Sequence, residues 1–304
     1  METGEPARDA FAAFEDDRKQ LLEQISAFGF AEHAEELTRV ARPAALLRYT
    51  RAIDAPVRVG ASKIGGEPDL PEDVAWPAKL GTSMAFVAQI ELRELARATR
   101  IDDFGREGLL SFFYDTERQA WGFRSSDRGS WKVLFTPAER ALVRRSFPSD
   151  LVAYARFKSR AVEFVRFLSI PDFGRVDDSH PRGWSLDDFG RYDDLRRAPF
   201  TRFALHPPLH QCGGYPHPIQ ADEMELECQL VSNGIELRSG RPTNDPRVEL
   251  LRRDAAQWKL LLQVDCDDSL GMDWGLGGTT YFWIRDDDLR RGDFDHVWLV
   301  FQTT

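Results

Sequence analysis

The sequence predicts an α+β protein with a mixed, mostly antiparallel sheet made of two related halves, and with helices at its N-terminus. One observation is that short apolar strand candidates, several of them aromatic, recur along the chain between glycine- and proline-rich loops. Another is that the pattern of residues 258–284, an apolar strand, an acidic glycine-rich turn and an aromatic strand, has a shorter counterpart in the first half. Both indicate two similar halves packed as one body.

Composition bounds the class of protein. A chain of 304 residues with 42% hydrophobic residues is long and apolar enough to bury a substantial core. The net charge of −10 argues against a nucleic-acid or acidic-membrane partner. The chain has no run of membrane-spanning length and no signal-peptide core at its N-terminus, and its three cysteines are odd in number and widely spaced. We therefore expect a cytoplasmic protein with reduced thiols.

The N-terminal segment, residues 1–43, is predicted to be helical and to pack on the body of the protein. Apolar residues recur at helical spacing from Phe11 to Phe28, and Gly29 follows as a stop signal. A shorter helix is expected over residues 31–41. The main domain then covers residues 44–304.

The main domain is predicted to contain two halves, residues 44–170 and 200–304, joined by an Asp-rich surface connection, residues 171–199. Further helices are expected after the capping-box sequences that begin at Thr136 and Ser185. The expected strands are 44–51, 86–91, 108–114, 131–135 and 296–302, with 121–123 as a further addition to the sheet.

Two segments allow both a helix and a strand. Residues 156–168 fit either, and the sequence does not decide between them. Residues 222–231 alternate as a strand would, but Asp222 can cap a helix and Gly234 can end one, so a helix is favoured slightly.

The internal repeat rests on several matches in the same order. Residues 65–68 and 213–216 both read Gly-Gly-x-Pro, and each precedes an apolar strand candidate that carries one glutamine, Gln89 or Gln263. Further matches are Glu91 with Asp265, Gly108 with Gly278, and Phe112-Phe113 with Phe282-Trp283. We therefore expect the two glutamines to lie on equivalent strands.

Residues from about Ser62 to Gln302 resemble the YwqG-like family, bacterial proteins that carry a domain of unknown function. The resemblance implies a cytoplasmic α+β domain and no particular activity. Relatives have an acid where Leu276 stands, which argues against a metal at the neighbouring turn, and an apolar residue where Gly213 stands, which weakens the glycine pair as part of the repeat. The segments that carry the resemblance are SKIGGEPDLPEDVAWP, FVAQIEL, GLLSFFYD, HQCGGYPHPIQ, ECQL, LLLQVDCDDSLGMDWGLGG, TTYFWI and DHVWLVFQ.

Neither a metal nor a cofactor is expected. Residues 265–273 offer oxygen ligands at alternate positions as a calcium loop does, but Leu270 and Leu276 replace its glycine and its glutamate. An acidic turn that stays solvated is the favoured interpretation. The histidines at 206, 210 and 217 lack zinc spacing, and Cys212 with a neighbouring histidine lacks the local signature of a catalytic nucleophile.

The strand glutamines give the candidate site. A buried carboxamide without partners costs roughly 1–3 kcal/mol, so Gln89 and Gln263 should be hydrogen bonded. We favour bonds to the backbone of a neighbouring loop, and the alternative is a polar cleft between the halves. The ligand-binding residues of that cleft would be Lys63, Gln89, Gln220, Gln263, Asp265 and Trp274.

The sequence contains no complete catalytic set, so a non-catalytic protein that binds a small molecule or another protein is the leading hypothesis. The alternative is a hydrolase with paired carboxylates, such as Asp265 with Glu227. That alternative requires the two carboxyl groups to converge in one pocket.

Overall fold

The computed structural model describes residues 15–99, 104–105, 107–175, 185–220, 222–238, 240–242 and 244–304. Its helices are α2 (Glu15–Ala27), α3 (Ala34–Val40), α4 (Leu92–Thr99), α5 (Leu186–Thr201), α6 (Met224–Ser232), α7 (Val248–Arg252) and α8 (Asp286–Arg291). The strands of its large sheet are β1 (Arg42–Tyr49), β2 (Lys63–Ile64), β6 (Ala85–Glu91), β7 (Leu109–Tyr114), β8 (Trp131–Thr136), β10 (Arg160–Ser169), β11 (Gln211–Gly213), β14 (Trp258–Asp265), β15 (Thr279–Arg285) and β16 (Trp298–Gln302). The short pairs outside it are β3 (Asp69–Leu70) with β9 (Val143–Arg144), β4 (Ala78–Lys79) with β5 (Thr82–Ser83), and β12 (Leu237–Arg238) with β13 (Arg241–Pro242).

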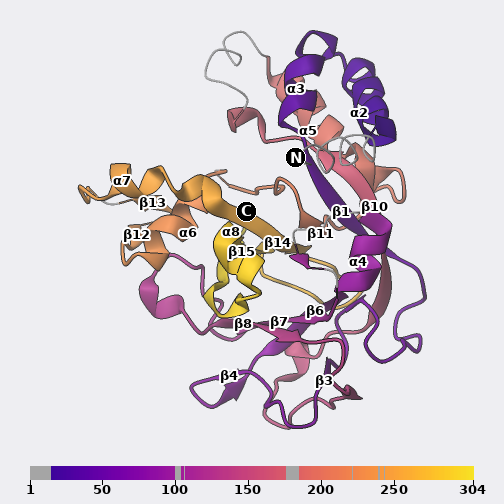
Figure 1. The fold of residues 1–304 in the computed structure, drawn as a ribbon, viewed down its shortest axis with the longest axis vertical. Helices are drawn as coiled ribbons and strands as arrows, with labels where there is room; N and C mark the ends of the chain where they lie inside the picture. The colour runs from indigo at the N-terminus through magenta and orange to yellow at the C-terminus, as the bar shows by residue number, and fades with distance from the viewer. Residues whose placement is uncertain are drawn as a thin grey trace, which may run out of the picture.

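The large sheet has ten strands in the order β16-β15-β14-β11-β1-β10-β2-β6-β7-β8. Every neighbouring pair is antiparallel, and the sheet curls until its two ends nearly meet (Figure 1). At that junction the Trp131 and Trp298 rings lie 5.0 Å apart, and Trp131 Nε1 donates a hydrogen bond of 2.8 Å to Val297 O. The two sheet ends are thus held together by tryptophans.

The strand order is symmetric about the central pair β1 and β10, as the sequence repeat predicts. Outward from β10 come β2, β6, β7 and β8, and outward from β1 come β11, β14, β15 and β16. In each half the short strand that leads into the Gly-Gly loop pairs with the glutamine strand next to it: Lys63 faces Gln89, and Gln211 faces Gln263. The predicted equivalence of the two glutamine strands is confirmed.

The glycines of the repeat occupy matching conformations. Gly65 and Gly66 have φ values of 66° and 74°, and Gly213 and Gly214 have values of 67° and 71°. These left-handed values favour glycine, so the Gly213 pair belongs to the repeat after all. Gly108 and Gly278 correspond as well, because a Cβ at either would lie 2.5 Å from a phenylalanine ring on the next strand.

The Asp-rich connection is more structured than the sequence indicates. Ser185 and Asp188 form the predicted capping box, but the helix that follows, α5, extends for 16 residues. Its buried face, with Tyr192 and Leu195, packs with Leu21 and Ile25 of α2 beside the start of the central strand β1 (Figure 1). The predicted N-terminal helices are therefore present in the described residues and rest on α5; residues 1–14 of that prediction and residues 176–184 of the connection lie outside the described ranges.

The two undecided segments are now assigned. Residues 160–169 form strand β10, and residues 224–232 form helix α6. The helix predicted to begin at Thr136 is wrong, because Thr136 ends β8 opposite Leu109 and a turn closed by Arg140 N and Pro137 O follows. Residues 121–123 do not form a strand either and lie in the loop between β7 and β8.

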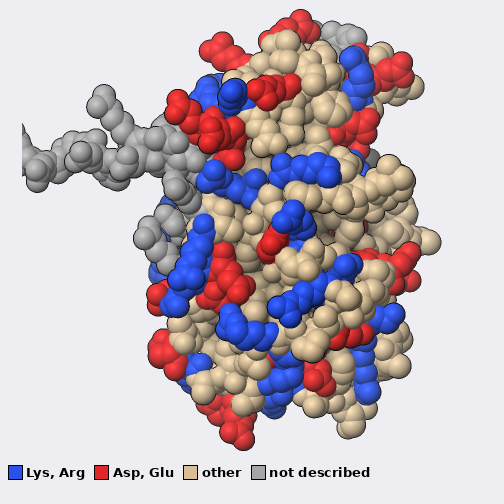
Figure 2. Space-filling view, turned by 90° about the vertical axis from the view of Figure 1, so that its right-hand side faces the viewer, with Lys and Arg blue, Asp and Glu red and all other residues tan. Residues whose placement is uncertain are grey.

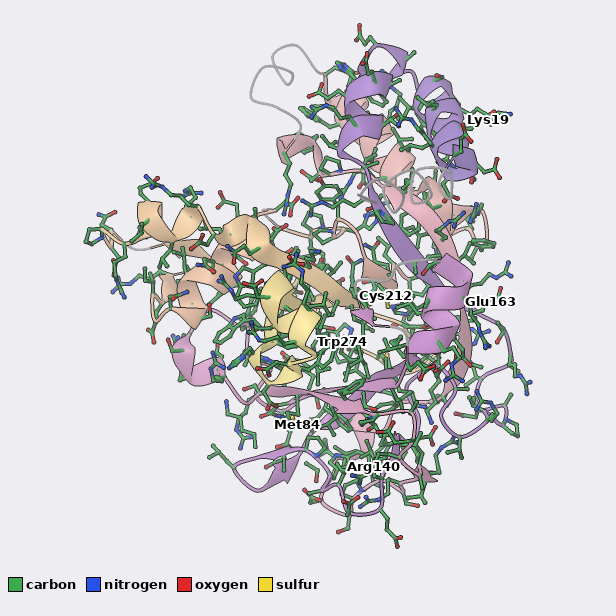
Figure 3. The ribbon with its side chains drawn as sticks, viewed as in Figure 1. Lys19, Met84, Arg140, Glu163, Cys212 and Trp274 are labelled. Carbon is green, nitrogen blue, oxygen red and sulfur yellow. The ribbon has the colours of Figure 1, made fainter. Side chains whose placement is uncertain are left out.

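The main core fills the space that the curled sheet encloses. The rings of Phe112 and Phe282, equivalent residues of the two halves, contact each other at 5.2 Å. Trp274 and Cys212 lie in the interior of the molecule (Figure 3). Basic and acidic side chains are interspersed over the surface on the α4 and β10 side (Figure 2). None of the described helices has the length and apolarity needed to cross a bilayer.

Candidate functional site

A cavity of about 750 Å³ lies where the loop of residues 118–127, from the first half, meets Gln220 and strand β12 of the second half. Its apolar wall is formed by Trp121, Phe123 and Leu237. Its polar wall contains Arg124 and Arg238. The cavity is open to solvent and has the size of a small-molecule site.

Hydrogen bonds to the backbone fix the loop of residues 118–127, which forms one side of the cavity. Trp298 Nε1 donates to Gly122 O at 2.9 Å, and Phe301 N donates to Trp121 O at 3.2 Å. Gly122 has a φ of 82°, and a Cβ there would meet the carbonyl oxygen of Leu299, so only glycine allows this approach. The loop is thereby held tightly against β16.

A further hydrogen bond joins the two segments on either side of the cavity, the loop of residues 118–127 and β12. Leu237 N, at the start of β12, donates to Phe123 O at 2.9 Å. The carboxylate of Asp127 accepts from Gly122 N and Arg124 N, each at 3.1 Å, which fixes the bend between the aromatic residues and the arginine. The cavity is therefore formed before any ligand arrives.

The lining of the cavity carries three arginines against one acid, Asp127, although the protein carries a net charge of −10. Arg118 pairs with Asp115 at 2.9 Å. Arg124 and Arg238 are exposed, and neither guanidinium forms an ion pair with an acid among the described residues. Two arginines in one cavity thus have no neutralising partner from the described part of the protein.

Helix α6 places a buried carboxyl group behind the cavity. Glu227 is buried, and its Oε2 atom has no hydrogen-bond partner in the described part of the chain. A Cβ on Gly240 would lie 3.4 Å from Phe123 Cζ and 3.5 Å from Glu227 Oε1, so Glu227 and the aromatic wall flank the same glycine. Burial, together with the nearby acids Glu223, Asp222 and Glu225, raises the pKa of Glu227 to about 8.

Of the six residues predicted from sequence, Gln220 lines this cavity. Its Nε2 atom donates to Thr303 O at 2.8 Å, and its backbone N–H donates to Gln302 Oε1 at 3.1 Å. The sequence alone did not reveal Trp121, Phe123, Arg124 and Arg238. The signal for the first three is the run Trp-Gly-Phe-Arg, in which the sequence predicts a strand over residues 121–123.

Lys63 and Gln89 come together elsewhere, in a buried polar cluster of the first half. Lys63 Nζ lies 3.6 Å from Asp69 Oδ2, and Gln89 Nε2 donates to the same oxygen at 2.7 Å. Burial lowers the pKa of Lys63 to about 8, while Asp69 opposes that shift. Arg144 also binds Asp69, so the cluster ties the first Gly-Gly loop to the sheet.

Gln263, Asp265 and Trp274 lie in the second half, also away from the cavity. The carboxylate of Asp265 accepts from Leu209 N at 3.0 Å and from Thr279 Oγ1 at 2.9 Å. Trp274 donates to Asp265 O at 3.1 Å and is buried against Tyr114 and Phe157. The six predicted residues therefore do not converge on one cleft, and Trp274 is a core residue.

The acidic turn is not simply solvated. Asp267 is buried and accepts hydrogen bonds from Ser269 and from the hydroxyl of Tyr49, which lies 2.9 Å from His210 Nε2. Burial alone would raise the pKa of Asp267, but hydrogen bonds from His210, Ser269 and Tyr49 hold it well below its usual range. His210 Nδ1 accepts from Asp265 N at 3.1 Å, so these groups pair with each other and fix the turn on β1.

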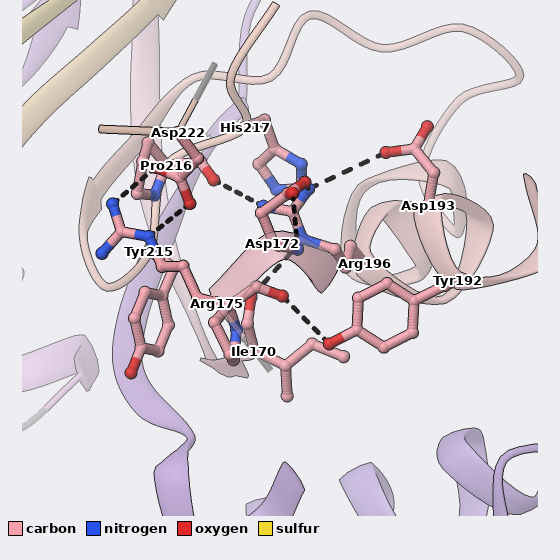
Figure 4. A network of polar contacts seen from close by, with 12 residues as sticks. Ile170, Asp172, Arg175, Tyr192, Asp193, Arg196, Tyr215, Pro216, His217 and Asp222 are labelled. Carbon is pink, nitrogen blue, oxygen red and sulfur yellow. Dashed lines mark hydrogen bonds and ion pairs between the residues drawn. The ribbon is translucent and has the colours of Figure 1, made fainter. Parts of the chain in front are cut away.

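Two arginines bind the segment after β10 to the second Gly-Gly loop and to the start of α6 (Figure 4). Arg196 pairs with Asp172 at 3.1 Å and donates to Pro216 O at 2.6 Å. Arg175 binds both Asp222 and Glu225. Asp222 thus holds an arginine and does not cap α6, whose N-cap residue, Glu223, makes no side-chain capping bond.

The carboxyl groups of Asp265 and Glu227 share no hydrogen-bond partner among the described residues. Asp265 binds Leu209, Cys266 and Thr279, whereas Glu227 sits on α6 behind the cavity. In a second acidic group, Asp288, Asp293 and His296 have potential ligand atoms within 4.8 Å of one another, and Asp288 also pairs with Arg291 at the end of α8.

The fold and the cavity define an α+β protein of two related halves with a ligand-sized space between them. The chain belongs to the family described as Domain of unknown function (DUF1963), whose sequence model matches residues 62–303. No curated protein matches the chain. The matched range covers both halves and the cavity and begins just before β2, so it leaves out α2, α3 and β1.

Proposed function

We propose that this protein is a non-catalytic ligand-binding protein whose ligand occupies the cavity between the loop of residues 118–127 and β12. The observation that carries the proposal is a preformed space of about 750 Å³ in which aromatic side chains stand beside arginines without ionic partners from the described residues. Ligand sites commonly combine an apolar wall with a few convergent polar groups. The partner is then a small molecule, and the acidic net charge of −10 disfavours nucleic acid and anionic membranes.

The proposal extends to the setting of the protein. The segments that resemble the YwqG-like family support a bacterial cytoplasmic protein. The cysteines support the same compartment, because Cys212, Cys228 and Cys266 are free thiols in the described residues and the first two are buried.

Blocking the cavity tests the proposal. Ala120 lines the space, and its substitution in Ala120→Trp adds a large side chain there, whereas Ala52→Trp adds the same side chain on an exposed turn. A library of metabolites is screened by thermal melting against wild type and both variants. We expect at least one compound to stabilise wild type and Ala52→Trp but not Ala120→Trp. Equal shifts in all three proteins would contradict the proposal.

A hydrolase is the alternative. Its support is Glu227, because a buried carboxyl group whose pKa is raised to about 8 is protonated at neutral pH and can act as a general acid. Such an enzyme needs a second catalytic group on the ligand side of the cavity. Hydrolysis of a panel of model esters and glycosides by wild type, but not by Glu227→Gln, would favour this alternative.

A further inference from the structure

The strongest chemical constraint on the ligand is the pair of arginines that face the cavity from its two sides. Arg124 comes from the loop after β7, and Arg238 comes from β12. Two unpaired positive charges that share one cavity repel each other, and a bound anion removes that repulsion. A guanidinium also matches a carboxylate or a phosphate in geometry, with two parallel hydrogen bonds.

The aromatic wall adds a second constraint. Trp121 is 37% exposed, although its ring packs on Phe301 at a centroid distance of 5.0 Å and on Phe123 at 6.0 Å. An indole backed in this way presents a flat, fixed face to the cavity, and such faces favour stacking with planar rings. A cationic ligand would also be drawn to these rings, but the arginines would oppose it.

The amide of Gln220 supplies a third constraint. Its Nε2 atom is used by Thr303 O, and its Oε1 atom accepts no hydrogen bond from the residues that the structure describes. That oxygen can accept an N–H or O–H from a ligand. A planar ring with a polar hydrogen satisfies Gln220 and stacks on Trp121 at the same time.

We infer that the ligand is a small planar anion, a carboxylate or phosphate borne by an aromatic or heteroaromatic group. This inference rests on the proposed function, because it assumes that the cavity is the ligand site. Aryl carboxylates and nucleoside monophosphates share this chemistry, and the experiment below separates them. The fixed loop and the bond from Leu237 N to Phe123 O mean that the ligand finds the site already assembled.

Isothermal titration calorimetry with six probes tests the inference: AMP, indole-3-carboxylate, benzoate, adenosine, inorganic phosphate and benzamidine. We expect saturable binding of AMP or of at least one of the two aryl carboxylates. Adenosine and phosphate, which each carry half of the chemistry, should bind roughly tenfold more weakly or worse, and benzamidine should not bind. Tighter binding of AMP than of the aryl carboxylates would identify the anionic group as a phosphate, and the reverse order would identify it as a carboxylate.

Variants locate the binding. Arg124→Gln and Arg238→Gln should each weaken the planar anion by roughly tenfold, and should reduce the dependence of its affinity on salt. Arg39→Gln, which removes an exposed arginine from α3, should change neither. Trp121→Leu removes the flat aromatic face, so we expect it to lose binding of the planar anion.

The outcomes separate the inference from the proposed function. If adenosine or benzamidine binds as tightly as the anions, or if the arginine variants bind the anions normally, the inference is overturned while the cavity remains a ligand site. No saturable binding of any planar anion also overturns it. If, in addition, no compound in the metabolite library distinguishes Ala120→Trp from Ala52→Trp, the proposed function fails as well.

Discussion

Gln89 and Gln263 hold equivalent loops in the two halves with the same pair of hydrogen bonds. Gln89 Oε1 accepts from Asp69 N and Gln263 Oε1 accepts from His217 N, both at 2.9 Å. The Nε2 atoms donate to Ala61 O at 2.8 Å and to Leu209 O at 2.7 Å. Each carboxamide therefore bridges the two sides of its Gly-Gly loop, which is the structural interpretation that the sequence favours.

Replacing either glutamine should destabilise the fold. Gln263→Leu leaves His217 N and Leu209 O without their buried partner, so we expect the free energy of unfolding to fall by roughly 1–3 kcal/mol. Gln89→Leu should behave in the same way. Urea denaturation measures both, with exposed Gln220→Leu as the control. A change in Gln263→Leu no larger than in the control would show that these bonds contribute little.

The close approach of the cavity loop to β16 should depend on Gly122. Gly122→Ala places a methyl group against Leu299 O, whereas Gly129→Ala meets nothing within 4 Å. Both glycines have positive φ, 82° and 85°, so both variants carry the same backbone strain. We expect Gly122→Ala to lose roughly 1–3 kcal/mol more stability than Gly129→Ala in denaturant titrations. Equal losses would mean that the loop is not held as described.

Glu227 should make the stability depend on pH. In the folded protein its pKa is raised from 4.5 to about 8, so between these values the folded state holds a proton that the unfolded state has released. Stability should therefore fall as pH rises through this window, by up to about 1.4 kcal/mol per pH unit from this group.

Comparison with Glu227→Gln isolates that contribution, because other titrating groups are common to both proteins. The variant keeps a neutral side chain at all pH values. Its free energy of unfolding should therefore increase relative to that of wild type as pH rises from 5 to 8. Glu249→Gln, at an exposed acid on α7, is the matched control. Parallel stability curves for wild type and Glu227→Gln would contradict the raised pKa.

The cysteines should differ in reactivity. Burial raises the pKa of all three thiols, but Cys212 and Cys228 are buried whereas Cys266 is only partly buried. We expect a thiol reagent to modify Cys266 first in the native protein and all three thiols after denaturation. A protected pair after denaturation would reveal a disulfide and argue against a reducing compartment.

The sequence made the repeat visible because its constraints are local to each half. A glutamine on a strand beside a Gly-Gly loop, and a glycine under a phenylalanine ring, leave the same residues at the same places in both copies. The strands themselves follow from apolar runs. Thr136 shows the limit of predicting elements from local patterns. Its capping-box sequence predicts a helix, but Thr136 pairs with Leu109 and ends strand β8.

The cavity could not be predicted in the same way, because its walls meet only when the sheet curls. Trp121 and Phe123 reach Leu237 because Trp131 and Trp298 bring β8 and β16 together, and no local pattern encodes that meeting. Arg196 is a similar case. It lies in a polar stretch whose sequence predicts a surface connection. The side chain is nevertheless buried, because its guanidinium pairs with Asp172 and donates a hydrogen bond to Pro216 O.

The central claim is that the cavity beside Trp121 holds the ligand, and fluorine NMR tests it most directly. The protein is labelled with 5-fluorotryptophan, and the Trp121 signal is identified by its absence in Trp121→Phe. During titration with AMP or indole-3-carboxylate, the account predicts that the Trp121 signal shifts saturably while those of buried Trp258 and Trp283 stay in place. A saturable shift confined to other tryptophans, or an unmoved Trp121 signal while calorimetry detects binding, would contradict it.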